Sequence, residues 1–357
     1  MTKHLRTGCC WLIFCVFLSI CFIFASPTLA NDTINLKVAT YTSDASAHHH
    51  VVKWWAKELE KRTDGNVKVK IYPGGSLVKA KEMLNAGKTG LADVVQVVPA
   101  YDPSKLVLAG APYKPFNTPP RADQFSLAFN KLAQNKDVKN EFNSLGVEYI
   151  FLNPSGNYNI MGKKPVRNLS DLKGLKIRSV GDYSVLLKAL GAVPVYTVAP
   201  DIYNALERGV VDVVAGCGDH WMYAYKVAEA SKNGYYTNNI NMGYAYTIQV
   251  MNKSKYDSLP SNVKNILGQL QAEIPKKAQE MQFSEEVIEK YIKMFKDLEI
   301  EFITFPTEDR KAMIKVQDEL LEAWIAEWEA KGVRAKEVMK DWKKIMAEVV
   351  KKYPDGL

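Results

Sequence analysis

Arg178 is the side chain in this sequence that is best placed to bind an anion. It ends a short apolar segment, residues 175–177, that follows the turn residue Gly174 and is typical of a buried strand. In open α/β sheets the ligand crevice lies beyond the carboxyl ends of the strands, where a guanidinium group matches a carboxylate bidentately. The alternative is a surface arginine that pairs with Asp171 or Asp182. The position of Arg178 alone leaves both interpretations open.

Two other groups of residues have the side-chain types that catalysis or metal binding requires. The run His48–His50 could ligate a transition metal, but consecutive side chains point in different directions, so at most two could share an ion. A role facing the ligand or capping the first helix is the alternative for these histidines. Cys217, Asp219 and His220 are the residue types of a thiol hydrolase, yet a catalytic Cys and His normally come from separate elements. We therefore expect no metal site, no cofactor and no enzyme activity.

The first thirty residues are typical of a secretory signal peptide. Lys3 and Arg6 precede the apolar run Trp11–Phe24, and small residues allow cleavage after Ala30. The bulky residue before Cys21 makes that position a poor lipoprotein site. No later stretch approaches the roughly twenty apolar residues of a membrane span. We expect residues 1–30 to be removed and the mature protein to be periplasmic.

Composition and charge are those of a globular protein. The chain has 357 residues, of which 47% are apolar and 24% charged, and this length is enough for two domains. Its net charge of +8 comes from 47 basic and 39 acidic residues without basic blocks, so we expect no nucleic-acid partner. Four of the five cysteines lie in the signal peptide, which leaves Cys217 alone and predicts a mature monomer without internal disulfides.

The hydrophobic pattern after residue 31 alternates between strands and helices, which indicates a mostly parallel sheet covered on both faces. Ser43 or Asp44 is the expected cap of the first helix. A polar turn at 153–158 suits a crossover between domains, and a kink is expected at Pro275. The predicted strands are 36–41, 67–72, 94–98, 148–152, 175–178, 193–196 and 244–251, and the predicted helices are 51–62, 79–86, 183–190, 201–207, 262–298 and 307–352, the last interrupted near Gly332.

An internal repeat supports two similar domains. The segments 85–95 and 204–214 share the pattern Asn-Ala-x-x-x-Gly-x-x-Asp-Val-Val without a gap. Each copy reads as a helix end, a glycine with a left-handed conformation and a buried strand. One copy closes each series of strands, so the simplest interpretation is two α/β domains with a cleft between them.

Several segments resemble the solute-binding subunits of tripartite ATP-independent periplasmic (TRAP) transporters, of the C4-dicarboxylate-binding type. They are Lys164-Pro-Val-Arg-Asn-Leu-Ser-Asp-Leu-Lys-Gly-Leu-Lys-Ile-Arg178, Leu187-Lys-Ala-Leu-Gly-Ala-Val-Pro-Val195, Tyr203-Asn-Ala-Leu-Glu-Arg-Gly-Val-Val-Asp212, Val69-Lys-Ile-Tyr-Pro-Gly-Gly-Ser-Leu77 and Asn252-Lys-Ser-Lys-Tyr-Asp-Ser-Leu-Pro260. The resemblance covers nearly the whole mature chain.

This resemblance implies a periplasmic-binding-protein-like α/β fold, with two domains around a cleft, crossing strands and a long bridging helix. It implies that Arg178 matches the arginine that grips the ligand carboxylate, and that a membrane permease is the protein partner. Domain I would comprise 31–152 plus about 243–280. Domain II, with the C-terminal bracing helices, would comprise 153–242 plus about 281–357.

The sequence departs from the family pattern at positions that decide the ligand. Ala215 and Gly216 stand where many members have a polar or acidic residue, which makes a metal-assisted mode doubtful. Asn157 stands where some binders of dicarboxylates or sugar acids have a second arginine. One fixed guanidinium group favours a single carboxylate or sulfonate over a dicarboxylate.

Aromatic residues near the expected cleft predict that the ligand is a monocarboxylate with an aromatic or bulky apolar body. One alternative is a protein of the same family that binds a small carboxylate or sulfonate. Another is a sensor protein that presents its ligand to a receptor. The residues expected to bind the ligand are Arg178, Asn157, Tyr158, Tyr41, His48, Gln96, Tyr101, Gly216, Asp219, His220, Trp221, Tyr244 and Tyr246.

Overall fold

The computed structural model describes residues 33–357. The predicted signal peptide, including Cys21, lies outside these residues. The described chain alternates strands and helices and builds one ten-stranded sheet, whose main path runs β2-β1-β3-β9-β4-β7-β5-β6. Within the described part, no helix is both long and apolar enough to cross a membrane.

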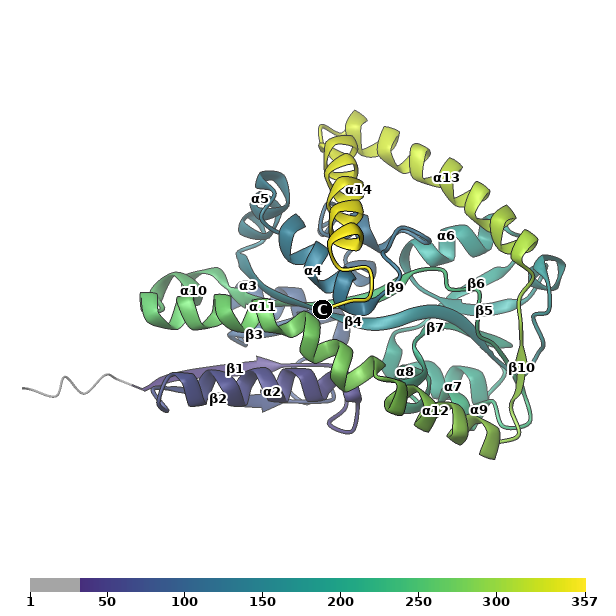
Figure 1. The fold of residues 1–357 in the computed structure, drawn as a ribbon, viewed down its shortest axis with the longest axis horizontal. Coiled ribbons are helices and arrows are strands. Elements are labelled where there is room, and N and C mark those ends of the chain that lie inside the picture. Colours follow the sequence, from purple (N-terminus) through teal and green to yellow (C-terminus); the bar gives the residue numbers. More distant parts are fainter. Residues whose placement is uncertain (1–32) are drawn as a thin grey trace, which may run out of the picture.

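The first half of the sheet is built on three parallel strands, with β1 between β2 and β3. All four residues of β3 are buried, which fits a strand inside a sheet with helices on both faces. One apolar core lies between this half and helices α2 and α11, and another lies on the opposite face beneath α3 and α4 (Figure 1). The elements are β1 (Ile34–Ala39), α2 (Ala47–Arg62), β2 (Val67–Tyr72), α3 (Met83–Thr89), β3 (Val94–Val97), α4 (Ala122–Leu132), α5 (Lys136–Ser144), α10 (Lys253–Ser258) and α11 (Ser261–Phe283).

Two long antiparallel strands join the halves of the sheet. β4 (Val147–Gly162) pairs with β9 (Tyr244–Asn252) over residues 147–157 and then with β7 and β8 over residues 158–162. β9 also pairs with β3 on its other side. Both halves therefore share one continuous strand, as Figure 1 shows at the centre of the molecule.

The second half repeats the parallel arrangement, with β5 between β6 and β7. The last helices extend across the molecule: α12 continues from α11 beside α8, and α13 and α14 follow β10 (Figure 1). The elements are β5 (Lys176–Ser179), α6 (Gly181–Ala189), β6 (Val193–Tyr196), α7 (Ile202–Glu207), β7 (Val213–Cys217), α8 (Asp219–Ala224), α9 (Val227–Ala230), β8 (Tyr235–Thr237), α12 (Glu285–Asp297), β10 (Glu301–Ile303), α13 (Thr307–Ala330) and α14 (Ala335–Lys352).

The internal repeat corresponds to the same local structure in both halves. Gly90 and Gly209 have φ angles of 74° and 71°, the left-handed conformation that the pattern predicts. In the first copy, Oδ2 of Asp93 accepts a hydrogen bond from the backbone N–H of Lys37 at 2.7 Å. In the second copy, Oδ2 of Asp212 accepts one from the N–H of Lys176 at 3.0 Å. The repeated aspartate thus joins each buried strand to its parallel neighbour.

The predicted turn at residues 153–158 is wrong, because this segment is part of β4. Pro154 is tolerated there because the register between β4 and β9 shifts between Pro154 and Gly156. At such an irregularity not every backbone N–H has to donate a hydrogen bond to the neighbouring strand, so proline, which has no N–H, can be accommodated. The expected cap of the first helix is also wrong. Ser46 is the N-cap, because residues 43–46 form a turn closed by a bond from the N–H of Ser46 to the carbonyl of Ser43.

The helical region 262–298 is interrupted at Ser284, between α11 and α12, and Pro275 lies inside α11. Proline lacks the N–H that would bond to the carbonyl four residues earlier, here that of Gln271. Nδ2 of Asn130 in α4 donates to this carbonyl at 3.1 Å instead, so α11 continues through Pro275. The interruption near Gly332 is confirmed, since α13 and α14 flank that residue.

Candidate functional site

Arg178 lies at the carboxyl end of β5 and is only 1% exposed. Its Nε donates to the backbone carbonyl of Thr197 at 2.9 Å, and its Nη1 donates to that of Ala215 at 3.3 Å. The interpretation as an exposed surface arginine is therefore wrong. Asp182 pairs with Lys114 at 2.6 Å, and Asp171 closes a capping box with Asn168. The guanidinium group is thus held by Thr197, directly after β6, and by Ala215 of β7, the strands on either side of β5.

Trp221 lies beside the guanidinium group, with 5.5 Å between its ring centroid and Cζ of Arg178. Gly216 makes room for this ring. A Cβ atom at Gly216 would approach the indole to 2.6 Å, which is closer than any normal contact. The space beside Gly216, which sequence analysis expected to bind the ligand, is therefore occupied by Trp221.

A cavity of about 590 Å³ spans the two halves, and Arg178 itself is not among the residues that line it. Thr197, whose carbonyl accepts the bond from Arg178, forms part of its wall. Aromatic rings cross the boundary between the halves: Tyr41 contacts Tyr101 at 6.1 Å and Tyr101 contacts Tyr196 at 6.4 Å, both measured between ring centroids. The lining residues are Tyr41, Gly74, Gly75, Lys79, Ala80, Lys81, Glu82, Tyr196, Thr197, Val198, Pro200 and Asp201.

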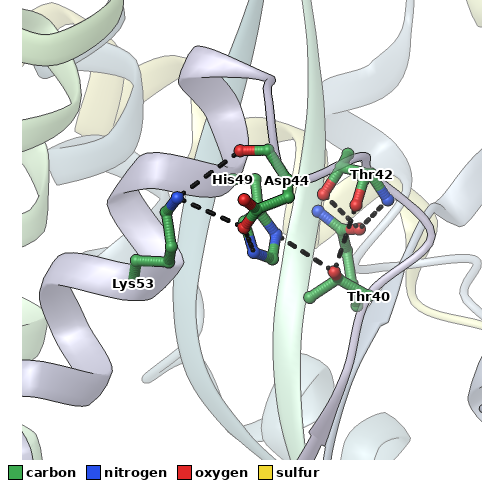
Figure 2. A network of polar contacts seen from close by, with 6 residues as sticks. Thr40, Thr42, Asp44, His49 and Lys53 are labelled. Carbon is green, nitrogen blue, oxygen red and sulfur yellow. Dashed lines mark hydrogen bonds and ion pairs between the residues drawn. The ribbon is translucent and has the colours of Figure 1, made fainter. Parts of the chain in front are cut away.

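The loop that carries Tyr41 is fixed by buried polar contacts. Oε1 of Gln96 accepts bonds from the backbone N–H groups of Tyr41 and Thr42, at 3.2 and 3.3 Å. Figure 2 shows the other side of this loop, where His49 lies between Thr40 and Asp44, at 3.2 and 3.5 Å. Gln96 thus acts on the cavity through the loop, as a positioning residue.

The three histidines of the run have separate surroundings. Nε2 of His48 bonds to the hydroxyl of Thr247 at 2.9 Å, whereas His49 bonds to Thr40. Burial lowers the pKa of His48 to about 3 and that of His49 to about 4, so both are neutral at pH 7. Within the described residues no group of histidine, cysteine and acidic side chains is arranged to hold a metal.

The structure divides the remaining predicted residues between two further places. Tyr246 is in the core, where its hydroxyl donates to the carbonyl of Ala109 at 2.7 Å. Tyr158 stacks on Tyr183 at 3.6 Å, and its hydroxyl lies 3.2 Å from that of Tyr113. A second cavity, distinct from the one beside Arg178, is lined by Asn157, Asp219, His220 and Tyr244.

Sequence analysis missed Tyr196 and Thr197, which form the wall beside Arg178. The signal was available, because Tyr196 ends the strand 193–196 and Thr197 follows it, and the rule that selected Arg178 applies equally to the end of this adjacent strand. Tyr113 was missed because its contacts with Tyr158 and Tyr183 join three segments that are distant in the sequence.

Comparisons with known proteins agree with this architecture. The family model of bacterial extracellular solute-binding proteins, family 7, matches residues 38–328. The chain is 29% identical over 275 residues to the C4-dicarboxylate-binding periplasmic protein DctP of Rhodobacter capsulatus, covering 74% of this chain and 79% of that protein.

Solved structures with the same fold include two TRAP solute-binding proteins. One, from Desulfovibrio salexigens, is 30% identical with a TM-score of 0.74, over 88% of this chain and 96% of that one. The other, from Rhodoferax ferrireducens in complex with copurified benzoate, is 21% identical with a TM-score of 0.80, over 89% and 99%. The predicted fold of two α/β domains around a cleft is confirmed. The chain belongs to family 7 of the bacterial extracellular solute-binding proteins, the periplasmic TRAP subunits that bind small organic acids for a membrane permease, and it is a transport protein and not an enzyme.

Proposed function

We propose that this protein binds a monocarboxylate with an aromatic or bulky apolar body and delivers it to a TRAP permease. The observation that supports this most is the placement of Arg178, buried at a strand end and oriented by the carbonyls of Thr197 and Ala215 beside a cavity that spans both halves. A guanidinium group fixed in this way binds a carboxylate with two charge-assisted hydrogen bonds.

The aromatic surroundings support a ligand with an apolar body. Trp221 lies beside Arg178, and Tyr41 and Tyr196 line the cavity. Rings of this kind bury the apolar part of a ligand, while the arginine fixes its charged end. The benzoate in the Rhodoferax ferrireducens protein shows that the fold accommodates such a molecule.

In this proposal the ligand brings the two halves together. Tyr101 lies before α4 and accepts a hydrogen bond from the N–H of Ala199, in the second half, at 3.2 Å. Closure around the ligand excludes water, which strengthens the bond between carboxylate and guanidinium. The ligand therefore shifts the equilibrium toward the form that the permease receives. The division at residues 152 and 153 into domains I and II is part of this proposal.

Calorimetric titration with benzoate, phenylacetate, benzenesulfonate and succinate tests the proposal. We expect an aromatic monocarboxylate to bind most tightly and Arg178→Ala to weaken it by about 2–5 kcal/mol, the usual effect of removing one partner of a buried charge pair. Arg178→Lys should recover only part of this loss, because lysine lacks the planar fork.

Arg310→Ala is a matched control. This arginine also donates to two backbone carbonyls, those of Ile240 and Asn241, but neither of these residues lines the 590 Å³ cavity, whereas Thr197, the partner of Arg178, does. Its removal should leave ligand affinity unchanged. Retained affinity in a folded Arg178→Ala protein, or preference for succinate, would contradict the proposal.

A further inference from the structure

The second cavity lies on the opposite face of β4 from Tyr158. Its volume is about 440 Å³, and it is bounded by β4, β9, the start of α8 and the junction between α11 and α12. Asn157 and Asn159 line it, whereas Tyr158 between them contacts Tyr113 and Tyr183, as alternation along a strand requires. Among the described residues, Arg178 is not part of the wall of this cavity.

Two glutamine side chains line this cavity. Nε2 of Gln279 donates to the carbonyl of Phe283 at 3.1 Å, and Nε2 of Gln282 donates to Oδ1 of Asn153 at 2.8 Å. These bonds fix which end of each amide is oxygen. Oε1 of Gln279 is buried and has no hydrogen-bond partner within residues 33–357, whereas the side chain of Gln282 also interacts with His48. A buried acceptor such as Oε1 of Gln279 favours a ligand that donates hydrogen bonds.

Asp219 adds a carboxylate to the same wall. Its Oδ1 accepts a hydrogen bond from the hydroxyl of Tyr236 at 2.5 Å. Burial raises the pKa of Asp219, and the hydrogen bond from Tyr236 offsets only part of this effect. The neighbouring His220 is 2% exposed, and burial lowers its pKa to about 3, so it is neutral and supplies no positive charge. The guanidinium group of Arg121, at the edge of the cavity, is paired with Asp123 at 3.2 Å.

Aromatic rings complete the wall. Phe283 meets Tyr244 edge to face at 6.0 Å and the His220 ring at 5.4 Å, and Tyr291 also lines the cavity. Aromatic faces attract organic cations and exclude water from around them. The carboxylate, the amide oxygen of Gln279 and the rings come from four different elements, and all of them suit the same class of ligand.

We propose that this cavity is a second ligand site, which binds a small organic primary ammonium ion. The ammonium group donates to Asp219 and to the oxygen of Gln279, and the rings of Phe283 and Tyr244 contact its apolar part. The proposal reassigns Asp219, His220, Tyr244 and Asn157, which the sequence had indicated for the anion. It is independent of the site around Arg178.

Three probes with the same ring and different charge separate the two sites. Benzylammonium, benzyl alcohol and benzoate are titrated into the full mature chain by calorimetry at neutral pH. We expect benzylammonium to bind at least about tenfold more tightly than benzyl alcohol, as a desolvated cation contact predicts. Asp219→Asn should weaken benzylammonium at least about tenfold and leave benzoate unchanged. Arg178→Ala should weaken benzoate binding and leave benzylammonium binding unchanged.

Asparagine at position 219 can still accept the bond from Tyr236, so the variant should fold. If it does not, Phe283→Leu provides the test, with a loss of benzylammonium affinity of about threefold or more. Equal binding of benzyl alcohol and benzylammonium would show an uncharged cavity and overturn the proposal. Loss of benzylammonium binding in Arg178→Ala would also overturn it, since both probes would then share one site.

Discussion

Arg178 was predictable because its placement depends on local sequence, a turn followed by a short buried strand. Its hydrogen-bond partners were not, since Thr197 and Ala215 lie on the neighbouring strands, 19 and 37 residues away. The same limit explains Gln96 and His48. Their residue types suggested ligand contact, but the fold places them where they bond to Thr42 and Thr247. Polar residue types indicate that a bond will be made, and only the fold decides with which group.

His48 makes the stability of the protein depend on pH. Its pKa is lowered from 6.5 to about 3, mainly by burial, so the folded state binds fewer protons than the unfolded state. The contribution of His48 to the free energy of unfolding is fully present above pH 6.5 and is lost as the pH falls. From pH 7 to pH 5 this group should reduce the free energy of unfolding by about 2 kcal/mol. Urea titration at both pH values measures the loss.

His48→Gln provides the comparison for this prediction. Glutamine can still bond to Thr247 and does not titrate, so the variant should lose less stability between pH 7 and pH 5. Some dependence should persist, because burial also lowers the pKa of His220 to about 3. An identical slope in wild type and variant would show that His48 is not responsible.

Among the elements, α11 shows how a distant residue compensates for a proline. Asn130 of α4 bonds to the carbonyl that Pro275 leaves without an N–H, so the helix continues to Phe283. The error at 153–158 has a similar origin: Pro154 and Gly156 are turn residues, yet they lie at a register shift in β4. The strands 67–72 and 193–196 were predicted to the residue, because their patterns are local. Where a distant residue or strand compensates for a proline or glycine that would normally interrupt a helix or strand, the local sequence pattern alone predicts the structure incorrectly.

Asn130→Asp should therefore destabilise the protein through α11. Aspartate can still accept the bond from Tyr149, which is 2.5 Å in length, but it cannot donate to the carbonyl of Gln271. We expect a loss of about 1–3 kcal/mol in the free energy of unfolding. In a Pro275→Ala background the helix supplies its own N–H, so the loss should shrink. Equal losses in both backgrounds would show that Asn130 does not replace the missing bond.

For the molecule as a whole, contacts between the two halves are not confined to the cavity. Lys114 lies in the segment between β3 and α4 of the first half. It pairs with Asp182 of α6 at 2.6 Å, and its ammonium group lies 4.0 Å from the ring centroid of Trp324 in α13. The lysine side chain is 5% exposed and that of Asp182 is 30% exposed. This ion pair joins three segments that are far apart in the sequence, and no sequence pattern predicted it.

Removal of Asp182 should leave a buried charge without its counterion. Asp182→Asn should lower the free energy of unfolding by about 3 kcal/mol, and the double change with Lys114→Met should recover much of that loss. Glu308→Gln is the control, because its ion pair with Lys311 is exposed and should contribute little. Urea unfolding of the four proteins gives the comparison. An Asp182→Asn protein as stable as wild type would contradict the assigned role.

The shared strands also determine the order in which the chain can fold. β9 lies between β3 and β4 in the sheet, yet in the sequence it comes after β5, β6 and β7. The first half therefore cannot complete its sheet until the last of its strands is available, and pairing between such distant segments is slow. We expect pulse-labelled hydrogen exchange during refolding to show Ile177 and Val214 protected before Val95 and Val250. Simultaneous protection would mean that the halves fold as one unit, and earlier protection of the first half would contradict this order.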